Sequence, residues 1–249
     1  MQDLKISLIT VTYNAESTIK RCIESVLAQN YDNIDYIIID GGSTDDTLKI
    51  IDQYKHRINF LVSEPDKGIY DAMNKGIQYA KGDIVGTLNA DDVFADTQVF
   101  NYLAAAFKQK NTAVVYANLD YVNEQGNIVR KWHAGKYKDG IFNWGWMPPH
   151  PTFYCKRELF ESFGLYKLQY GTAADYELML RFIHLNKLNN IYYLNKVIVK
   201  MNTGGVSNVS YRNRLKACWF DLKAMRKNGI LLPYITIFFK PLRKIIQYI

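Results

Sequence analysis

The first half of the sequence repeatedly places polar side chains directly after short apolar segments. The four polar groups are Thr12-Tyr13-Asn14, Asp40-Gly41-Gly42-Ser43, Glu64-Pro65-Asp66-Lys67-Gly68 and Asn89-Ala90-Asp91-Asp92. Carboxylates can bind a base, a ribose or a metal ion, and backbone amides at the start of a helix can bind phosphate. Together these groups suit a nucleotide that carries a diphosphate.

Asp91 and Asp92 form the acidic pair after the fourth apolar segment. A hard divalent cation, Mg²⁺ or Mn²⁺, prefers carboxylate oxygens and neutralises the charge of a departing diphosphate as a Lewis acid. We therefore expect Asp91 and Asp92 to bind a metal ion. The alternative is that one of them caps the next helix, near Asp96-Thr97.

The elements that must hold these groups alternate between strand and helix. Apolar, β-branched runs predict strands over residues 5–12, 36–40, 58–62 and 83–88. Helices are expected after a cap at Asn14, after a capping box at Ser43-Thr44-Asp45-Asp46, and over residues 69–80. This alternation predicts an α/β fold, mainly a parallel sheet with helices on both faces, whose ligand binds at the carboxyl ends of the strands.

The second half of the sequence is less regular. Residues 113–122 and 128–132 predict a hairpin, residues 175–185 a helix and residues 191–201 a strand. No internal repeat or flexible linker interrupts the chain. We therefore expect one domain over residues 1–210, followed by a C-terminal segment over residues 211–249.

Composition narrows the class of partner. The 249 residues are 48% hydrophobic, which is enough to bury a full core, and the formal net charge is +7. The basic residues do not form a stripe with interleaved aromatics, so nucleic acid is not an expected partner. An anionic membrane surface or a phosphorylated substrate fits better, although a solvated surface rich in lysine is the simplest explanation.

The cysteines and the N-terminus bear on location. Cys22, Cys155 and Cys218 lie far apart, which suggests neither a disulfide framework nor a zinc site. Residues 1–5 lead directly into the first expected strand without the pattern of a signal peptide. A cytoplasmic location is expected, with the protein peripheral on the inner face of the plasma membrane if it binds lipid.

Several motifs resemble the family 2 glycosyltransferases of the GT-A fold. In the first half these are SLITVTYN at residues 7–14, IDGGSTDDT at 39–47 and LNADD at 88–92. Downstream they are His150-Pro151-Thr152-Phe153, Ala174-Asp175-Tyr176-Glu177-Leu178 and Gly204-Gly205-Val206-Ser207. The resemblance covers residues 4–210, and the chain looks most similar to bacterial enzymes that build polysaccharide repeat units on a lipid carrier.

The resemblance implies an inverting transfer of a sugar from a nucleotide diphosphate-sugar, by default a UDP-sugar, to an acceptor hydroxyl. The acceptor would be a lipid-linked glycan in cell-surface polysaccharide synthesis. Such a reaction needs a general base, which the resemblance places at Asp175, with Glu177 as the alternative carboxylate. On its own sequence context, Asp175 would simply cap the helix that follows it.

The same resemblance assigns further residues. Those expected at the donor are Thr12, Tyr13, Asn14, Asp40, Glu64, Asp66, Lys67, Asn89, Ala90 and Asp91, and those expected on the acceptor side are His150 and Glu177. Alternatives stay open for some of them. Tyr13 would equally pack in the core, Glu64 and Asp66 would serve a turn around Pro65, and His150 would be a hydrogen-bonded structural residue.

Three positions depart from the family pattern. Asn89 replaces the first acid of the usual Asp-x-Asp, so Asp91 should provide most of the metal binding. Gly41 replaces the second acid of the usual Asp-Asp-Gly-Ser, which leaves Asp40 to recognise base or ribose. Met73 replaces a frequent arginine, and Lys67 or Lys75 would supply the phosphate contact instead.

The C-terminal segment and two loops keep more than one interpretation. Residues 230–249 are strongly apolar but contain Lys240, Arg243 and Lys244, and the apolar run before Lys240 is shorter than the ~20 residues that span a bilayer. A helical, amphipathic tail at the membrane interface is expected, or else helices packed on the domain or on a second subunit. Trp144 and Trp146 either stack on sugar or pack in the core. Gly204-Gly205 either closes over a diphosphate or turns the chain.

Three other functions fit the sequence less well. A sugar nucleotidyltransferase would carry a glycine-rich phosphate loop early in the chain, and Val11-Thr12-Tyr13-Asn14 is not such a loop. A dehydrogenase would show Gly-x-Gly-x-x-Gly after the first strand, and none is present. A non-catalytic nucleotide-sugar-binding protein would not need Asp91 and Asp175 together.

Overall fold

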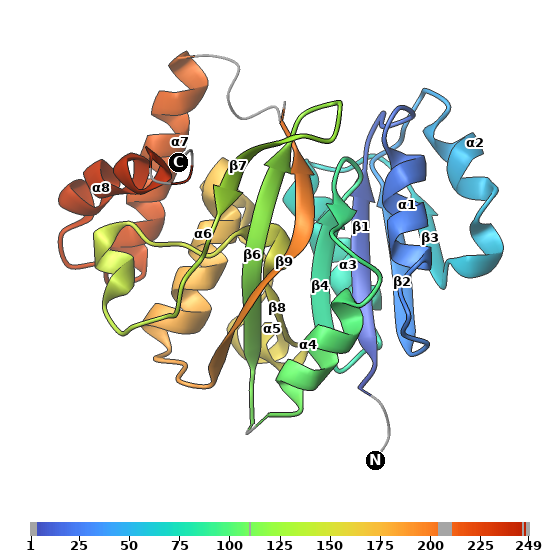
Figure 1. Cartoon of the computed structure of the whole chain (residues 1–249). Helices are drawn as coiled ribbons and strands as arrows, with labels where there is room; N and C mark the ends of the chain where they lie inside the picture. The colour runs from blue at the N-terminus through green and yellow to red at the C-terminus, as the bar shows by residue number, and fades with distance from the viewer. Residues whose placement is uncertain (1–3, 110, 204–210, 246, 248–249) are drawn as a thin grey trace.

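The computed structural model describes residues 4–109, 111–203, 211–245 and 247 (Figure 1). The strands are β1 (Ile6–Thr12), β2 (Ile34–Asp40), β3 (Phe60–Ser63), β4 (Ile84–Asn89), β5 (Val93–Phe94), β6 (Val114–Val122), β7 (Ile128–Trp132), β8 (Tyr154–Lys156) and β9 (Ile191–Asn202). The α-helices are α1 (Ile19–Leu27), α2 (Thr47–Asp52), α3 (Ile69–Tyr79), α4 (Val99–Phe107), α5 (Glu158–Phe163), α6 (Ala174–Met179), α7 (Tyr211–Lys227) and α8 (Pro233–Ile245). Short 3₁₀ turns are η1 (Lys55–Arg57), η2 (Ile141–Trp144), η3 (His150–Thr152) and η4 (Leu168–Ala173), and η5 (Leu180–Leu185) is a π-helical turn that continues α6.

The strands form one sheet in the order β3-β2-β1-β4-β8-β6-β9-β5, with β7 paired to β6. Strands β3, β2, β1 and β4 are parallel, and so is the pair β6 and β9. The short strand β8 runs antiparallel to both β4 and β6. The predicted, mainly parallel α/β sheet and the 114–132 hairpin are therefore confirmed.

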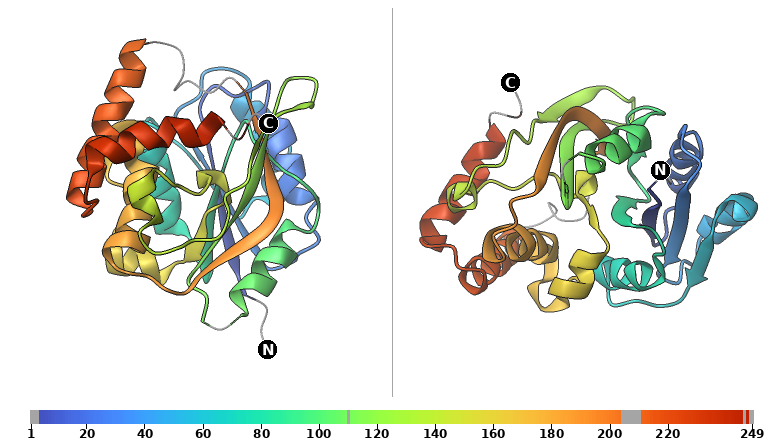
Figure 2. Two further views of the ribbon diagram at one scale, coloured as in Figure 1. Left: turned by 60° about the vertical axis from the view of Figure 1, so that its left-hand side comes forward. Right: turned by 90° about the horizontal axis from the view of Figure 1, so that it is seen from below.

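The sheet is buried because its strands are apolar on both faces. In β1, Ile9 and Val11 belong to a core that includes α3, α5 and α6, while Ile6 and Leu8 belong to a second core with α1 and α4. Figure 2 shows the two layers of helices on opposite faces of the curved sheet. A strand with helices on both faces reads as a continuous apolar run, which is the pattern from which these strands were predicted.

Two predicted helix starts are wrong. Helix α1 begins at Ile19 and not after Asn14, because Asn14 adopts a left-handed conformation (φ 46°) and accepts a hydrogen bond from the Thr44 amide at 2.9 Å. Helix α2 begins only at Thr47, and Ser43 accepts a hydrogen bond from the Asn14 amide at 2.8 Å. The side chains of Asn14 and Ser43 thus join two loops and do not start helices.

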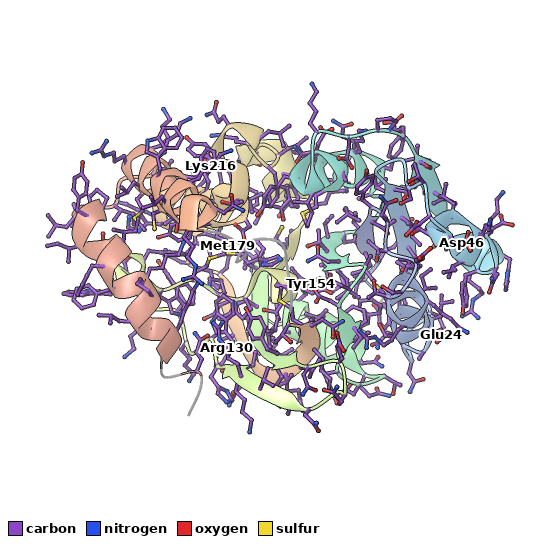
Figure 3. The ribbon with its side chains drawn as sticks, turned by 90° about the horizontal axis from the view of Figure 1, so that it is seen from above. Glu24, Asp46, Arg130, Tyr154, Met179 and Lys216 are labelled. Carbon is purple, nitrogen blue, oxygen red and sulfur yellow. The ribbon has the colours of Figure 1, made fainter. Side chains whose placement is uncertain are left out.

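Strand β8 enters the sheet beside a glycine of β4. A Cβ atom on Gly86 would lie 2.0 Å from a carbon of the Tyr154 ring, so only glycine leaves room for that ring. Figure 3 shows Tyr154 near the centre of the molecule, between the two halves of the sheet. The glycine therefore lets an antiparallel strand close the gap between β4 and β6.

The C-terminal helices pack against the rest of the chain. Ala224, Met225 and Ile230 are buried in the same core as α3 and α6, and a Cβ atom on Gly171 would lie 2.4 Å from the Phe220 ring of α7. Figure 1 shows α7 and α8 together at one side of the molecule, opposite α2. Within the described residues, no helix combines the length and apolar character needed to cross a bilayer.

Candidate active site

The carboxyl ends of the parallel strands bring the predicted polar groups to one edge of the sheet. Thr12 is the register partner of Asp40, and Asp40 is the partner of Ser63. Asn89 of β4 is the partner of Val11, and the Ala90 amide donates to the Val11 carbonyl at 3.2 Å. Residues distant in sequence are therefore neighbours at this edge.

Asp40 organises the loops at the edge. Its buried carboxylate accepts hydrogen bonds from the Gly42 and Ser43 amides at 3.1 and 2.9 Å, and from the Ser43 and Ser63 hydroxyls at 2.5 and 2.6 Å. Burying a charge is costly unless it is hydrogen-bonded, and these four bonds meet that need. The sequence predicts that Asp40 contacts base or ribose. In the structure, donors of the protein itself already occupy its carboxylate.

A second carboxylate, that of Asp66, lies where the family pattern has its missing acid. A Cβ atom on Gly41 would lie 2.6 Å from Asp66 Oδ2 and 3.4 Å from the Tyr13 ring. Asp66 Oδ1 is held by the Gly68 amide at 2.7 Å, and the Tyr13 ring is 63% exposed. Gly41 thus separates an exposed aromatic face from a fixed carboxylate oxygen, an arrangement that can stack on a base and accept its N–H.

The two candidate phosphate lysines differ in their surroundings. Lys75 Nζ lies 2.8 Å from Glu64 Oε1 and 3.1 Å from the Pro65 carbonyl, so it and Glu64 bond each other at the loop after β3. Lys67 is exposed, and its backbone amide donates to Asp71. Met73 is buried in the core, so the position of the usual arginine does not face a ligand.

The residues after β4 divide into a surface carboxylate and a buried one. Asp91 is half-buried, and its carbonyl accepts a hydrogen bond from Asn202 of β9 at 2.9 Å. Asp92 is fully buried and accepts a bond from the Asn89 amide group at 3.3 Å. Burial, and then the charge of Asp91, raise the pKa of Asp92 well above its usual range. Of the two expected metal ligands, Asp91 therefore presents the accessible carboxylate.

These residues fit a divalent cation that is shared with a ligand. The described part of the chain holds no group of three or more His, Cys, Asp or Glu side chains arranged as a metal cage. However, Mg²⁺ is commonly held by one or two carboxylates together with phosphate and water oxygens. Beside Asp91, the buried Asn89 Oδ1 and Asp92 Oδ1 atoms have no hydrogen-bond partner among the described residues. Such acceptor oxygens suit a hard cation brought by a diphosphate.

Asp175 and His150 face each other across the site. Asp175 lies in the first turn of α6, where its Oδ1 accepts from the Tyr176 amide at 2.7 Å and its Oδ2 lies 3.6 Å from His150 Nδ1. Burial lowers the pKa of His150, and the charges of Asp175 and Asp91 oppose that shift. His150 is therefore close enough to interact electrostatically with both predicted carboxylates.

Rigid anchoring holds this side of the site. The Thr152 hydroxyl bonds the Ala117 amide and carbonyl of β6 at 3.1 and 2.9 Å, which fixes the loop of His150 to the sheet. The Tyr70 hydroxyl of α3 lies on the same side, 3.5 Å from the Thr172 carbonyl. Burial, and then the charge of Asp175, raise the pKa of this hydroxyl. Tyr70 is not among the predicted site residues, since a tyrosine in a helix usually indicates core packing.

Glu177 has a structural place in this fold. It is fully buried and bonds the Arg181 guanidinium, with Arg181 Nη2 at 3.0 Å from Glu177 Oε2. Arg181 also donates to the Gly164 and Leu165 carbonyls at 2.8 Å. The pair therefore ties α6 to the turn before η4, in place of the expected acceptor-side role of Glu177.

Trp144 and Trp146 differ in how far they are buried. Trp146 is buried, and its indole donates to the Ala134 carbonyl at 2.7 Å, as expected for core packing. Trp144 is 57% exposed, so the core interpretation is wrong for that residue. The Gly204-Gly205 motif lies outside the described residues.

The chain is similar to known proteins over most of its length. The sequence profile of the family described as Glycosyl transferase family 2 matches residues 7–165. An uncharacterized glycosyltransferase of Mycobacterium tuberculosis is 34% identical over 188 residues, which cover 71% of this chain and 68% of that protein. The UDP-Glc:alpha-D-GlcNAc-diphosphoundecaprenol beta-1,3-glucosyltransferase WfgD of Escherichia coli is 33% identical over 135 residues, 54% of this chain and 53% of WfgD.

The fold is also similar to a solved structure. The mannosyltransferase PcManGT of Pyrobaculum calidifontis, in complex with GDP-Man and Mn²⁺, superposes with a TM-score of 0.67. The match covers 96% of this chain and 73% of that one, at 16% sequence identity. At this identity the likeness concerns the fold, and it confirms the predicted GT-A architecture.

The buried pair of Glu177 and Arg181 predicts a loss of stability. Glu177→Ala should lower the free energy of unfolding by about 3–5 kcal/mol, because it leaves a buried guanidinium without its carboxylate. Glu161→Ala is the matched control, since it breaks an exposed i,i+4 pair with Arg157; it should cost less than about 1 kcal/mol. Denaturant unfolding measures both values, and equal losses would contradict the assignment.

The lowered pKa of His150 predicts a pH-dependent stability. Below the ordinary histidine pKa of 6.5, the unfolded chain binds a proton at this residue more readily than the folded chain does. The free energy of unfolding should therefore fall as the pH falls through this range. His150→Asn should show a shallower dependence in unfolding measured between pH 7.5 and pH 5.5. Identical curves for the two proteins would show that His150 does not titrate as argued.

Proposed function

The chain belongs to glycosyl transferase family 2, and on that premise we propose that it moves a sugar from a UDP-sugar to a hydroxyl of a lipid-linked glycan, with inversion at the anomeric carbon. The single observation that carries the proposal is that His150 Nδ1 lies 3.6 Å from Asp175 Oδ2, while the charge of Asp91 also acts on the pKa of His150. Asp91 follows β4, beside buried oxygens that have no partner in the described part of the chain, and Asp175 lies in the first turn of α6.

Asp175 is the general base of this proposal. Its Oδ2 faces His150, while Oδ1 is held by the Tyr176 amide, so the carboxylate has a fixed orientation. Asp175 Oδ2 takes the proton of the acceptor hydroxyl as that oxygen attacks the anomeric carbon from the face opposite the leaving diphosphate. Attack from that face inverts the configuration. Burial lowers the pKa of the neighbouring His150, which therefore leaves the charge of the carboxylate in place at neutral pH.

Asp91 is the metal ligand of the proposal, with Asn89 Oδ1 as a neutral oxygen beside it. A bound Mg²⁺ or Mn²⁺ supplies Lewis acidity that neutralises the charge on the departing diphosphate. Among solved structures with this fold, PcManGT holds Mn²⁺ together with GDP-Man. The buried Asp92 positions Asn89, because its carboxylate accepts a hydrogen bond from the Asn89 side chain.

The donor base is proposed to bind between Tyr13 and Asp66. Tyr13 offers an exposed ring for stacking, and Asp66 Oδ2 offers an acceptor for a base N–H. Thr12 Oγ1 is buried without a partner among the described residues, and Asn14 holds the neighbouring loop. The exposed Lys67 is proposed to contact phosphate. UDP is chosen because the relative WfgD uses UDP-Glc.

The acceptor assignment also comes from WfgD, whose acceptor is a sugar linked to diphosphoundecaprenol. A lipid-linked glycan is therefore the proposed acceptor, and cell-surface polysaccharide synthesis is the proposed process. A non-catalytic nucleotide-sugar-binding protein would require Asp91 but would have no use for an oriented Asp175. Loss of turnover without loss of donor binding distinguishes the two functions.

Replacing the base should abolish turnover while donor binding continues. Asp175→Asn should lower kcat by about 10²–10⁴-fold, because the amide keeps the size of the side chain but cannot accept a proton. Glu158→Gln, which changes an acid in the first turn of α5, is the matched control. Transfer assays and donor titrations give both quantities, and retention of near-normal kcat in Asp175→Asn would rule out this base.

The donor experiment uses protection against thermal unfolding. UDP-, GDP- and dTDP-sugars are tested with and without Mn²⁺ on the wild type and on Asp91→Ala. A saturating donor at 100 times its Kd stabilises by ~2.7 kcal/mol, which is a shift of several degrees in Tm. We expect the shift with UDP-sugars and Mn²⁺ only, and its loss in Asp91→Ala. A shift with GDP-sugars instead would replace the donor, and no shift with any nucleotide would overturn the donor site.

The base pocket predicts a role for Asp66 that differs from that of Asp40. Asp66→Ala should weaken UDP binding by about tenfold, because one hydrogen bond to a charged acceptor is lost, and it should leave stability nearly unchanged. Asp40→Ala should instead lower stability, because four hydrogen bonds to a buried carboxylate are lost. Isothermal titration with UDP and thermal unfolding separate these effects. Unchanged UDP affinity in Asp66→Ala would contradict the pocket.

A further inference from the structure

Helix α8 is apolar on the side that faces away from the protein. Its inner side packs through Ile237 and through the Thr236 hydroxyl, which donates to the Asn143 carbonyl at 2.7 Å. On the outer side, Leu231 just before the helix and Ile235, Phe238 and Leu242 within it follow at intervals of four, three and four residues. They are 81%, 47%, 65% and 42% exposed. A helix that is apolar on both sides requires a second apolar environment.

The apolar side continues beyond α8. An open groove of about 460 Å³ lies between the first turn of α8 and η2, and it is lined mainly by apolar atoms. The exposed Trp144 borders this groove, and Leu232 and Tyr234 are also exposed, at 60% and 63%. Tyrosine and tryptophan are favoured where an apolar phase meets water. We call Leu231, Leu232, Tyr234, Ile235, Phe238, Leu242 and Trp144 the outer apolar face.

The net positive charge of the chain is concentrated in α7 and α8. Residues 211–245 contain nine basic side chains and one acidic side chain, Asp221, whose Oδ1 lies 2.7 Å from Lys240 Nζ. The basic side chains are Arg212, Arg214, Lys216, Lys223, Arg226, Lys227, Lys240, Arg243 and Lys244. The rest of the chain holds 22 basic and 23 acidic residues, out of totals of 31 and 24. The net charge of +7 therefore originates in these two helices.

We propose that the outer apolar face docks on an anionic lipid bilayer, with the basic residues of α7 and α8 against the lipid headgroups. Helices that combine exposed bulky apolar side chains with lysine and arginine lie in the plane of the membrane interface. Each basic residue near an anionic surface adds to the attraction, and long basic side chains can keep their charge in water while their stems cover lipid.

The charge pattern favours lipid over a second copy of the chain. A symmetric pairing through α8 would bring two strongly basic segments together, and the single aspartate of each is already paired with a lysine. Like charges placed opposite one another at an interface are repulsive. An anionic bilayer offers an apolar interior and a negative surface in the same place, so it satisfies both properties of the face.

This docking surface goes beyond the proposed function, because it requires neither a donor nor an acceptor. It is nevertheless connected to the catalytic side of the molecule. Phe220 of α7 packs against Gly171, four residues before Asp175, and Lys223 Nζ bonds the Gln169 carbonyl at 3.3 Å. Figure 3 shows α7, with Lys216, at the side of the molecule opposite Asp46.

Vesicle flotation tests the proposal on the full chain. The vesicles are phosphatidylcholine alone, or phosphatidylcholine with phosphatidylglycerol. We expect the wild type to float with the anionic vesicles, to bind neutral vesicles at least about tenfold more weakly, and to be released by salt. Leu231→Ser combined with Phe238→Ser should weaken anionic binding at least about tenfold. Leu185→Ser, at an exposed leucine elsewhere (49%), should have no effect.

A charge series provides the second arm. Lys227→Glu with Lys244→Glu should weaken anionic binding at least about tenfold, whereas Lys20→Glu with Lys55→Glu makes the same change in net charge on α1 and η1 and should not. Equal losses in the two charge variants, or failure of the wild type to float, would overturn the proposal. So would a dimer that Leu231→Ser with Phe238→Ser dissociates while vesicles do not bind. The shift in Tm with donor is measured on every variant, so failure of the proposed function is recognised separately.

Discussion

A single buried carboxylate holds the edge of the sheet on which the site depends. Asp40 accepts four hydrogen bonds from the loops after β2 and β3, and its backbone carbonyl accepts a fifth from the Glu64 amide. The Gly41 amide donates in turn to the Thr12 carbonyl of β1. Because a buried charge needs these donors, the three loops are held in one arrangement. Tyr13 and Asp66 derive their relative position from that arrangement.

The other half of the site depends on a contrast between exposed and buried acids. Asp91 and Asp175 keep part of their carboxylates accessible, whereas Asp92 and Glu177 are fully buried and bonded to Asn89 and Arg181. The Glu177 carboxylate holds Arg181, which bonds backbone carbonyls before η4. The Asp92 carboxylate bonds the Asn89 side chain and keeps one buried oxygen without a partner among the described residues. The site thus has two acids at each end, one buried and one that a ligand can reach.

Much of this was predictable from residue pattern, and the failures have physical causes. The parallel strands and the 114–132 hairpin were predicted within about two residues, because continuous apolar runs report burial on both faces. Strand β8 was not predicted, because three residues carry no period and its place depends on Gly86 leaving room for Tyr154. Asp66 and Gly41 are adjacent only in space. The Glu177 and Arg181 pair has helical spacing, but spacing does not reveal which side of a helix is buried.

The packing of the Phe220 ring against Gly171 limits where this chain could be joined to another member of its family. The profile of the family ends at Leu165, before η4, Asp175 and α7. At Gly171 the backbone has φ 47° and ψ −126°, a conformation reserved for glycine, and a Cβ atom there would meet the Phe220 ring. The η4 loop and α7 are consequently one packed unit. In a chimera of two relatives, a crossover between η4 and α7 would separate Gly171 from the Phe220 ring that packs on it. A crossover before residue 168 would keep the two together.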